Sequence, residues 1–366
     1  MQNKMESNAF FPDELLRQMR RQADPVADEL VAALMQTGDR QALHGWWDSV
    51  AVNGEPLPHG LPDTVKYYLS ETQNPPAWAD RRRMQRGHAF FARHAAPILS
   101  ILGCLSLPYC YAAADGAQVL WLSQRIRHDT RRRLAETARF LLDVMAPEAF
   151  EPRGKGIRSI QKVRLIHAVA RHYAGHSENW DDAWGVPVNQ EDMAGTNLAF
   201  SYIVLQGLQK LNVQWSKPEA EDFLHLWNVI GTMLGLDERL LPNDLQAAYW
   251  LDRKIVARHF RRSEAGTGLT KALLQSLYEL NESTVTQAFA DAYMRYLLGD
   301  AVADLLEVPP ANGAKPLVSA FKTVNLLSSF ATGFSAVKPE KVAATLQNQL
   351  KKQQAAADFP VPKAFG

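Results

Sequence analysis

The stretch that decides the fold is GIRSIQKVRLIHAVARHY, residues 156–173. Apolar residues recur in it at intervals of three and four, and glycine occurs only at its first position. This is the period of an amphipathic helix, so we predict one helix over residues 156–173. Arg164, His167 and Arg171 are spaced by three and then four residues, which brings them to one side of that helix. The pattern therefore turns an imidazole and two guanidinium groups toward the interior.

Two interpretations of His167 are open. One is a core histidine whose ring nitrogens are satisfied by backbone or carboxylate groups. The neighbouring sequence favours a metal ligand instead, because RLIHAVARH, residues 164–172, followed by Tyr173, resembles the signature of the latex clearing protein / mycophenolic acid B-type oxygenase family. The resemblance implies an all-helical protein that binds haem b, with His167 as the proximal ligand of the iron.

A second motif, RLAET, residues 133–137, strengthens the resemblance. In the family an arginine and a threonine four residues apart face the haem from its distal side, and they fall on Arg133 and Thr137. A weaker similarity in RYLLGD assigns Arg295 to a family arginine near the cofactor. The resemblance covers roughly residues 80–300, and it implies that Arg133 and Thr137 act at the oxygen-binding face.

The chain departs from the family pattern at two places. Rubber-cleaving members have a lysine immediately before the distal threonine, where this chain has Glu136. A buried glutamate can act as a general base for an allylic proton. The catalytic carboxylate of the latex enzymes lies upstream of the distal helix, where this chain has Ala117 and Gln118, with Asp115 as the nearest acid. Glu136 and Asp115 are therefore both candidates for the base.

The resemblance also suggests roles around His167. Arg164 and Arg171 lie one turn to either side of it, where they would pair with the haem propionates, because guanidinium binds carboxylate bidentately. The alternative for both is ordinary ion pairs within the protein. The second ring nitrogen of a ligating histidine is expected to donate to a carbonyl or carboxylate.

Composition limits the function classes. The 366 residues carry 40 Lys and Arg against 39 Asp and Glu, which argues against a nucleic-acid partner. Cys104 and Cys110 give no disulfide framework, and the first 25 residues show no apolar core after a basic start, so we expect a cytoplasmic protein. Walker, Rossmann and nucleophile-elbow motifs are absent from the sequence, and His172 and His176 lack the glutamate of a zinc protease motif.

We expect an all-α, globin-like, multi-helix fold, because no segment shows the period-two pattern of a strand. Its expected parts are a peripheral helical lobe over 1–75 containing Trp46 and Trp47, a haem-binding domain over 76–337, and a C-terminal helix with a frayed tail over 338–366. Further helices are expected over 25–37, 129–145, with Asp129 as cap, 192–211, 218–234, 244–262, 269–280, 283–298, 316–335 and 338–353.

The uncharged stretch AAPILSILGCLSLPYCYAAA, residues 95–114, allows two interpretations. Its length would suffice to cross a bilayer. Pro97, Gly103 and Pro108 interrupt it, which favours a buried pair of helices, and peripheral membrane contact is the alternative. With a haem in the protein, such a stretch would form the apolar wall of the binding site.

These features together predict a haem b-dependent oxygenase that uses O2 to cleave a carbon–carbon double bond in a small isoprenoid or lipid substrate. A different class of protein stays open: a non-catalytic helical protein of the same fold that binds haem or a lipid. The intact Arg133, Thr137 and His167 favour the enzyme, whereas Glu136 and the missing upstream carboxylate favour the binding protein.

Overall fold

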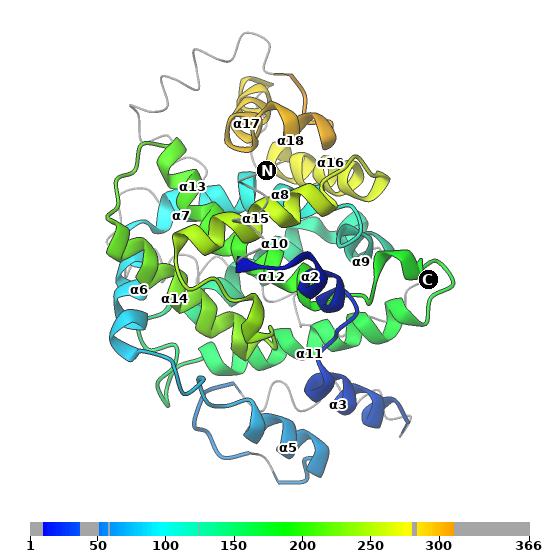
Figure 1. Ribbon diagram of the computed structural model, residues 1–366, viewed down its shortest axis with the longest axis vertical. Coiled ribbons are helices and arrows are strands. Elements are labelled where there is room, and N and C mark those ends of the chain that lie inside the picture. The colour runs from blue at the N-terminus through cyan, green and yellow to red at the C-terminus, as the bar shows by residue number, and fades with distance from the viewer. Residues whose placement is uncertain (1–9, 37–50, 58, 124, 280–283, 311–366) are drawn as a thin grey trace.

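Helix α11 (Gly156–Gly175) runs between the N-terminal helices and the main body of helices in Figure 1, and it separates two hydrophobic cores. The computed structural model describes residues 10–36, 51–57, 59–123, 125–279 and 284–310. Within them all regular structure is helical, apart from one isolated bridge between Ala113 and Phe260. The predicted all-α fold and the predicted helix over 156–173 are both confirmed.

The smaller core lies between α11 and two N-terminal helices, α3 (Pro25–Gln36) and α5 (Asp63–Glu71). Leu165, Ala168 and Val169 of α11 pack into it and are almost fully buried. Burial of such side chains contributes about 25 cal/mol for each Å² of apolar surface removed from water. The N-terminal helices are therefore joined to the rest of the chain through this side of α11.

The larger core lies on the other side of α11, where Ile157 and Ile160 pack. It also takes in Phe11 and residues of the first described helix, α2 (Asp13–Met19). The N-terminal segment thus contributes to both cores, α2 to the larger and α3 with α5 to the smaller. Trp46, Trp47 and the stretch expected to form a C-terminal helix and tail lie outside the described residues.

Close backbone contacts at the start of α11 explain why positions 154 and 156 are glycine. A Cβ atom at Gly154 would lie 1.9 Å from the carbonyl oxygen of Glu148, and one at Gly156 would lie 2.7 Å from the carbonyl oxygen of Ala149. Any larger residue would push the linker away from the end of α10 (Arg125–Met145). The close approach holds α10 against α11, the two helices that carry the family motifs.

The uncharged stretch forms one helical run, not a pair of helices. It consists of α7 (Ala95–Ile101), a π-helical turn (Leu102–Ser106) and α8 (Leu107–Ala112). Pro108 has no N–H to bond the preceding turn, a usual cause of such local widening. The run is long and apolar enough to cross a membrane, and half of it is buried inside the structure. Membrane contact by the remainder stays a prediction.

The remaining helices complete the larger core. Their bounds are α6 (Arg81–Arg93), α9 (Ala117–Leu122), α12 (Gln190–Phe200), α13 (Tyr202–Lys210), α14 (Lys217–Met233), α15 (Leu245–His259), α16 (Glu264–Glu279), α17 (Thr284–Leu298) and α18 (Asp300–Leu305), with short 3₁₀ turns at Asp182–Trp184 and Glu238–Leu240.

Several of the predicted helices were wrong in detail. The helix expected over 269–280 begins five residues earlier, at Glu264, and the helix expected over 244–262 ends at His259. The helix expected to begin at Asp129 begins at Arg125, so Asp129 lies within α10 and does not cap it. The helix expected over 192–211 is two helices, because the backbone at Ser201 leaves the helical region with φ −112° and ψ −83°. The expected helices over 316–335 and 338–353 lie outside the described residues, and α18 had no expected counterpart.

Candidate active site

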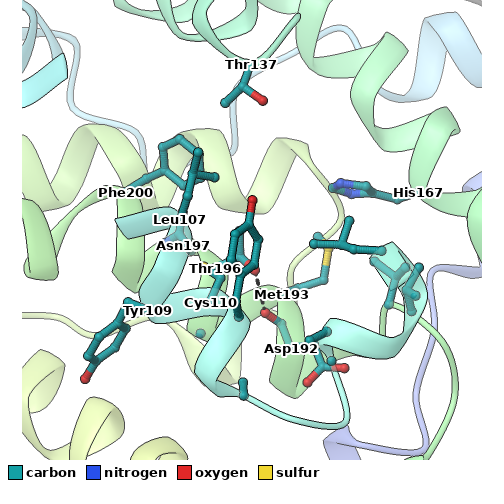
Figure 2. Close-up of a pocket in the computed structure, with 18 of the residues that line it drawn as sticks. Leu107, Tyr109, Cys110, Thr137, His167, Asp192, Met193, Thr196, Asn197 and Phe200 are labelled. Carbon is teal, nitrogen blue, oxygen red and sulfur yellow. Dashed lines mark hydrogen bonds between the residues drawn. The ribbon is translucent and has the colours of Figure 1, made fainter. Parts of the chain in front are cut away.

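A mostly apolar cavity of about 330 Å³ lies between α10, α11 and the helices of the larger core. Its volume is in the range of small-molecule pockets. Its lining includes the four candidate site residues Arg133, Glu136 and Thr137 from α10, and His167 from α11. Figure 2 shows Thr137 and His167 on different sides of the cavity. The structure therefore brings the two motifs to a single site.

His167 presents a neutral imidazole to this cavity. Burial, together with the positive charges of Arg171 and Arg133, lowers the pKa of His167 to about 3. Its Nδ1 atom is buried and has no hydrogen-bond partner among the described residues. The expected hydrogen bond to a carbonyl or carboxylate is thus not formed at this nitrogen. A neutral imidazole with an unused nitrogen is the form that binds a metal.

Arg133 and Thr137 lie one turn apart on α10. The Thr137 hydroxyl donates to the carbonyl oxygen of Arg133 at 2.9 Å, which leaves the lone pairs of its oxygen available. No hydrogen bond or ion pair joins the Arg133 guanidinium to any described residue, although it is partly buried and borders the cavity. A guanidinium in an apolar site without an anionic partner is costly, so its place is suited to an anionic or oxygen-bearing ligand.

Glu136 and Asp115, the two candidates for a general base, differ in position. Glu136 borders the cavity, and its Oε1 pairs with the Arg132 guanidinium at 3.2 Å. Asp115 is not among the residues that border the cavity. Burial opposes its ionisation, but the His259 ring at 3.7 Å and the hydrogen-bonded Arg261 guanidinium hold the pKa of Asp115 below its usual value. Of the two, Glu136 is the one that can meet a ligand.

The arginines flanking His167 are engaged with the N-terminal segment. Arg164 binds Asp24 through two hydrogen bonds, from Nε at 2.6 Å and from Nη2 at 2.7 Å. Arg171 donates from Nε to Asp28 at 2.7 Å. Neither arginine borders the cavity. This geometry favours the alternative of internal ion pairs over a role at the haem propionates.

Arg295, the weakest member of the predicted site, also has internal partners. Its guanidinium pairs with Asp300 at 3.0 Å and with Asp304 at 2.6 Å, and it donates to the carbonyl oxygen of Val308 at 2.8 Å. It joins α17 to α18 and does not border the cavity. Its place in the structure supports a role in stability.

Sequence patterns did not reveal a buried charged cluster behind the cavity. Glu191 at the start of α12 accepts from Arg258 at 2.6 Å and lies 3.0 Å from Nε2 of His259. Its neighbour Asp192, which borders the cavity, accepts from Arg20 at 2.9 Å. These partners are far apart in the sequence, and the helix-start signal at Asn189 was the only local trace of the cluster.

A second polar pair borders the cavity at a distance from the motifs. The Tyr109 hydroxyl on α8 donates to Oδ1 of Asp252 on α15 at 2.7 Å. Burial raises the pKa of Asp252 to about 6, although the Tyr109 hydrogen bond and the charge of Arg253 oppose this shift. In Figure 2, Tyr109 and His167 lie on opposite sides of the cavity.

The residues present fit a haem. The described residues include no group of three or more His, Cys, Asp or Glu side chains that could hold a bare metal ion. His167 alone therefore suits an iron whose other ligands come from a porphyrin. The apolar walls suit the macrocycle, and the unpaired Arg133 suits a carboxylate or an oxygen atom.

Comparisons with known proteins identify the family and the fold. Residues 110–327 match the family model described as ER-bound oxygenase mpaB/B'/Rubber oxygenase, catalytic domain. The chain is 27% identical over 286 residues to a rubber oxygenase of Streptomyces sp., which covers 77% of this chain and 70% of that protein. Its fold is similar to the structure of latex clearing protein in the closed state, with a TM-score of 0.75, 24% identity and 91% of each chain covered.

Proposed function

The chain belongs to the family of ER-bound oxygenase mpaB/B' and rubber oxygenase catalytic domains, and on this premise we propose that it is a haem b-dependent oxygenase. The reaction is the oxidative cleavage of a carbon–carbon double bond in a small isoprenoid or lipid substrate, with O2 as co-substrate. The observation that carries the proposal is the neutral His167, which shares an apolar cavity with Thr137 and with Arg133, whose guanidinium has no partner among the described residues.

Each side chain has a distinct role in this proposal. When bound, the haem supplies the binding and activation of O2. His167 holds the iron through a ring nitrogen, and the apolar walls exclude water and accept the hydrocarbon chain. Arg133 offers donors to oxygen atoms in a site of low dielectric, where such donors contribute most to stabilising developing negative charge.

Glu136 is the proposed acceptor for an allylic proton of the substrate. Its Oε1 is held by Arg132, and its Oε2 accepts no hydrogen bond from a described residue. Oε2 is therefore the oxygen available for the proton. Glu136 takes this role in place of a carboxylate at position 117, where the chain has alanine.

The test is the absorption spectrum of the full chain expressed with a supply of haem. We expect a Soret band in the wild type and its loss or shift in His167→Ala. His172→Ala is the matched control, because His172 lies on the same helix outside the cavity lining, and its spectrum should equal that of the wild type. A wild type that takes up no haem would contradict the proposal.

Oxygen consumption separates the enzyme from the alternative binding protein. With an unsaturated isoprenoid and the haem-loaded protein we expect O2 uptake and shortened carbonyl products. The saturated chain of equal length should give neither. A haem-loaded protein that shows spectral shifts with the unsaturated chain but no O2 uptake would identify a binding protein.

A further inference from the structure

Asp252 differs from the other buried acids of the described part of the chain. Five acidic residues are buried there, and four of them pair with an arginine: Asp24, Asp115, Glu191 and Asp222. Asp252 forms no salt bridge with any described residue, and its single hydrogen bond comes from the Tyr109 hydroxyl. A carboxyl group buried without a cation is costly unless another donor satisfies it.

The missing donor has a defined place. Tyr109 binds Oδ1, and no described residue donates to Oδ2. Asp252 is only 8% exposed, and it borders the cavity that also contains His167 and Thr137. Arg253 lies near enough for its charge to favour the ionised form of Asp252 but forms no salt bridge with it. Phe260, whose ring meets that of Tyr109 edge to face at a centroid distance of 4.6 Å, has no polar atom on its side chain. A donor for Oδ2 can therefore come from a ligand in the cavity.

The chemistry of the Asp252–Tyr109 pair decides which ligand group is suited to donate to Oδ2. A hydroxyl group is both a donor and an acceptor, so it can satisfy the carboxyl group whether that group is ionised or protonated. An ammonium group suits only the ionised form, and a ligand carboxylate suits only the protonated form. The rest of the lining is mostly apolar, which disfavours a charged end on the ligand.

We propose that Asp252, oriented by Tyr109, binds the terminal hydroxyl group of a chain-shaped apolar substrate. The inference rests on the proposed function, and it names the substrate class as an unsaturated alcohol. Tyr109, which donates to Asp252, lies on the side of the cavity opposite His167 (Figure 2), so the carbon chain runs from Asp252 toward Thr137, on the distal side of the proposed haem. Asp252 thereby sets which double bond along the chain reaches the reactive end.

Binding to the haem-free full chain tests the proposal without any turnover. The probes are farnesol, its methyl ether, farnesene and farnesylamine, and the readout is the emission of Trp227, which borders the cavity. We expect farnesol to bind about tenfold more tightly than its methyl ether, because a hydrogen bond to a charged group has about this effect. Equal affinities for farnesol and the ether, or tighter binding of the amine, would overturn the proposal.

A variant pair with a matched control adds a second readout. Asp252→Leu should remove the preference for farnesol and leave farnesene binding as strong as before or stronger. The control is Asp291→Leu, because Asp291 also accepts from a tyrosine hydroxyl, that of Tyr278, but lies outside the cavity lining. Its farnesol affinity should match that of the wild type.

The outcomes separate the two proposals. Farnesene binding without any preference for farnesol would overturn the role of Asp252 and leave the oxygenase proposal standing. If no probe bound, the cavity would not be a chain-binding site, and both proposals would fail. The comparison of farnesol with its ether uses the wild type alone, so it stays decisive even if Asp252→Leu does not fold.

Discussion

Arg164, His167 and Arg171 share one face of α11 but have opposite environments. Toward the N-terminal segment, on the ionic side, Arg164 and Arg171 are tied to Asp24 and Asp28. Toward the larger core, on the cavity side, His167 borders an apolar cavity, and its Nδ1 has no partner among the described residues. One helix face thus combines ion pairs that stabilise the fold with an unsatisfied imidazole that is available to a ligand.

The two sides contribute in opposite directions to the free energy of the folded state. A buried polar group without a partner raises the free energy of the folded state. The ion pairs one turn to either side hold the helix so that this group cannot turn away. The ion pairs of Arg164 and Arg171 therefore stabilise the fold while His167 keeps a nitrogen without a partner. Each of the following changes tests either the ionic side or the cavity side.

The largest effect is expected on the ionic side. Arg164→Leu removes both hydrogen bonds that Asp24 accepts from Arg164 and leaves it a longer contact with Arg171 at 3.9 Å, and Asp24 is only 4% exposed. We expect the free energy of unfolding to fall by about 3 kcal/mol, as measured by urea denaturation. Arg17→Leu, which breaks an exposed pair with Glu14, should leave it nearly unchanged. Equal losses in the two variants would contradict the proposed role of the buried pair.

On the cavity side, Arg133→Met should affect turnover and leave stability intact. The guanidinium has no partner among the described residues, so its loss orphans no other group. We expect the rate of O2 uptake to fall about 100-fold, in the range for removal of a donor at a developing charge. The denaturation midpoint should stay equal to that of the wild type or rise. A marked drop in stability with unchanged turnover would assign Arg133 to the fold.

Acid should destabilise the protein through His167. Its folded-state pKa is about 3, whereas an unfolded histidine titrates near its model value of 6.5. Below pH 6.5 the unfolded state therefore binds more protons, and stability falls with pH down to about 3. The slope from this group is at most about 1.4 kcal/mol for each pH unit.

The variant His167→Phe should lose that part of the slope in denaturation curves of the haem-free protein. His88, whose pKa burial lowers to about 4, contributes in the same direction and is retained in the variant. The difference between the two proteins therefore isolates His167. Parallel pH profiles would show that the His167 ring is protonated in the folded protein at acidic pH.

The smallest effect is expected at the more exposed ion pair. The Asp28 side chain is 31% exposed, and Asp28→Asn keeps an oxygen that can accept from Arg171. We expect a loss of about 1 kcal/mol in the free energy of unfolding, typical of a hydrogen bond that changes from charged to neutral. A loss as large as that of Arg164→Leu would show that both pairs act as one unit.

The sequence was sufficient for the elements with strong local patterns. The three-and-four period predicted α11 nearly to its ends, and polar caps with apolar runs located α14, α15 and α17 to within a few residues at their N-terminal ends. Predictions from the sequence were less accurate where contacts with distant segments decide the backbone conformation. The break at Ser201 and the early start of α10 at Arg125 carry no clear local signal.

For the candidate site, the motifs were enough to select Arg133, Glu136, Thr137 and His167, which all border one cavity. The spacing of Arg164 and Arg171 placed them beside His167 but could not name their partners. Asp24 and Asp28 are separated from these arginines by 140 and 143 residues in the sequence. Helical spacing gives no information about contacts between segments so far apart.

The sequence by itself determined the helical class, the central helix and the identity of the residues that meet at the cavity, because helical periodicity and short motifs are local properties. Only the tertiary structure decided which polar groups are paired and which are open. Pairing depends on atoms that chain folding brings together from distant segments, as with Arg164 and Asp24. His167, Arg133 and Asp252 can be recognised as open groups only when the contacts of the described residues around the cavity are known.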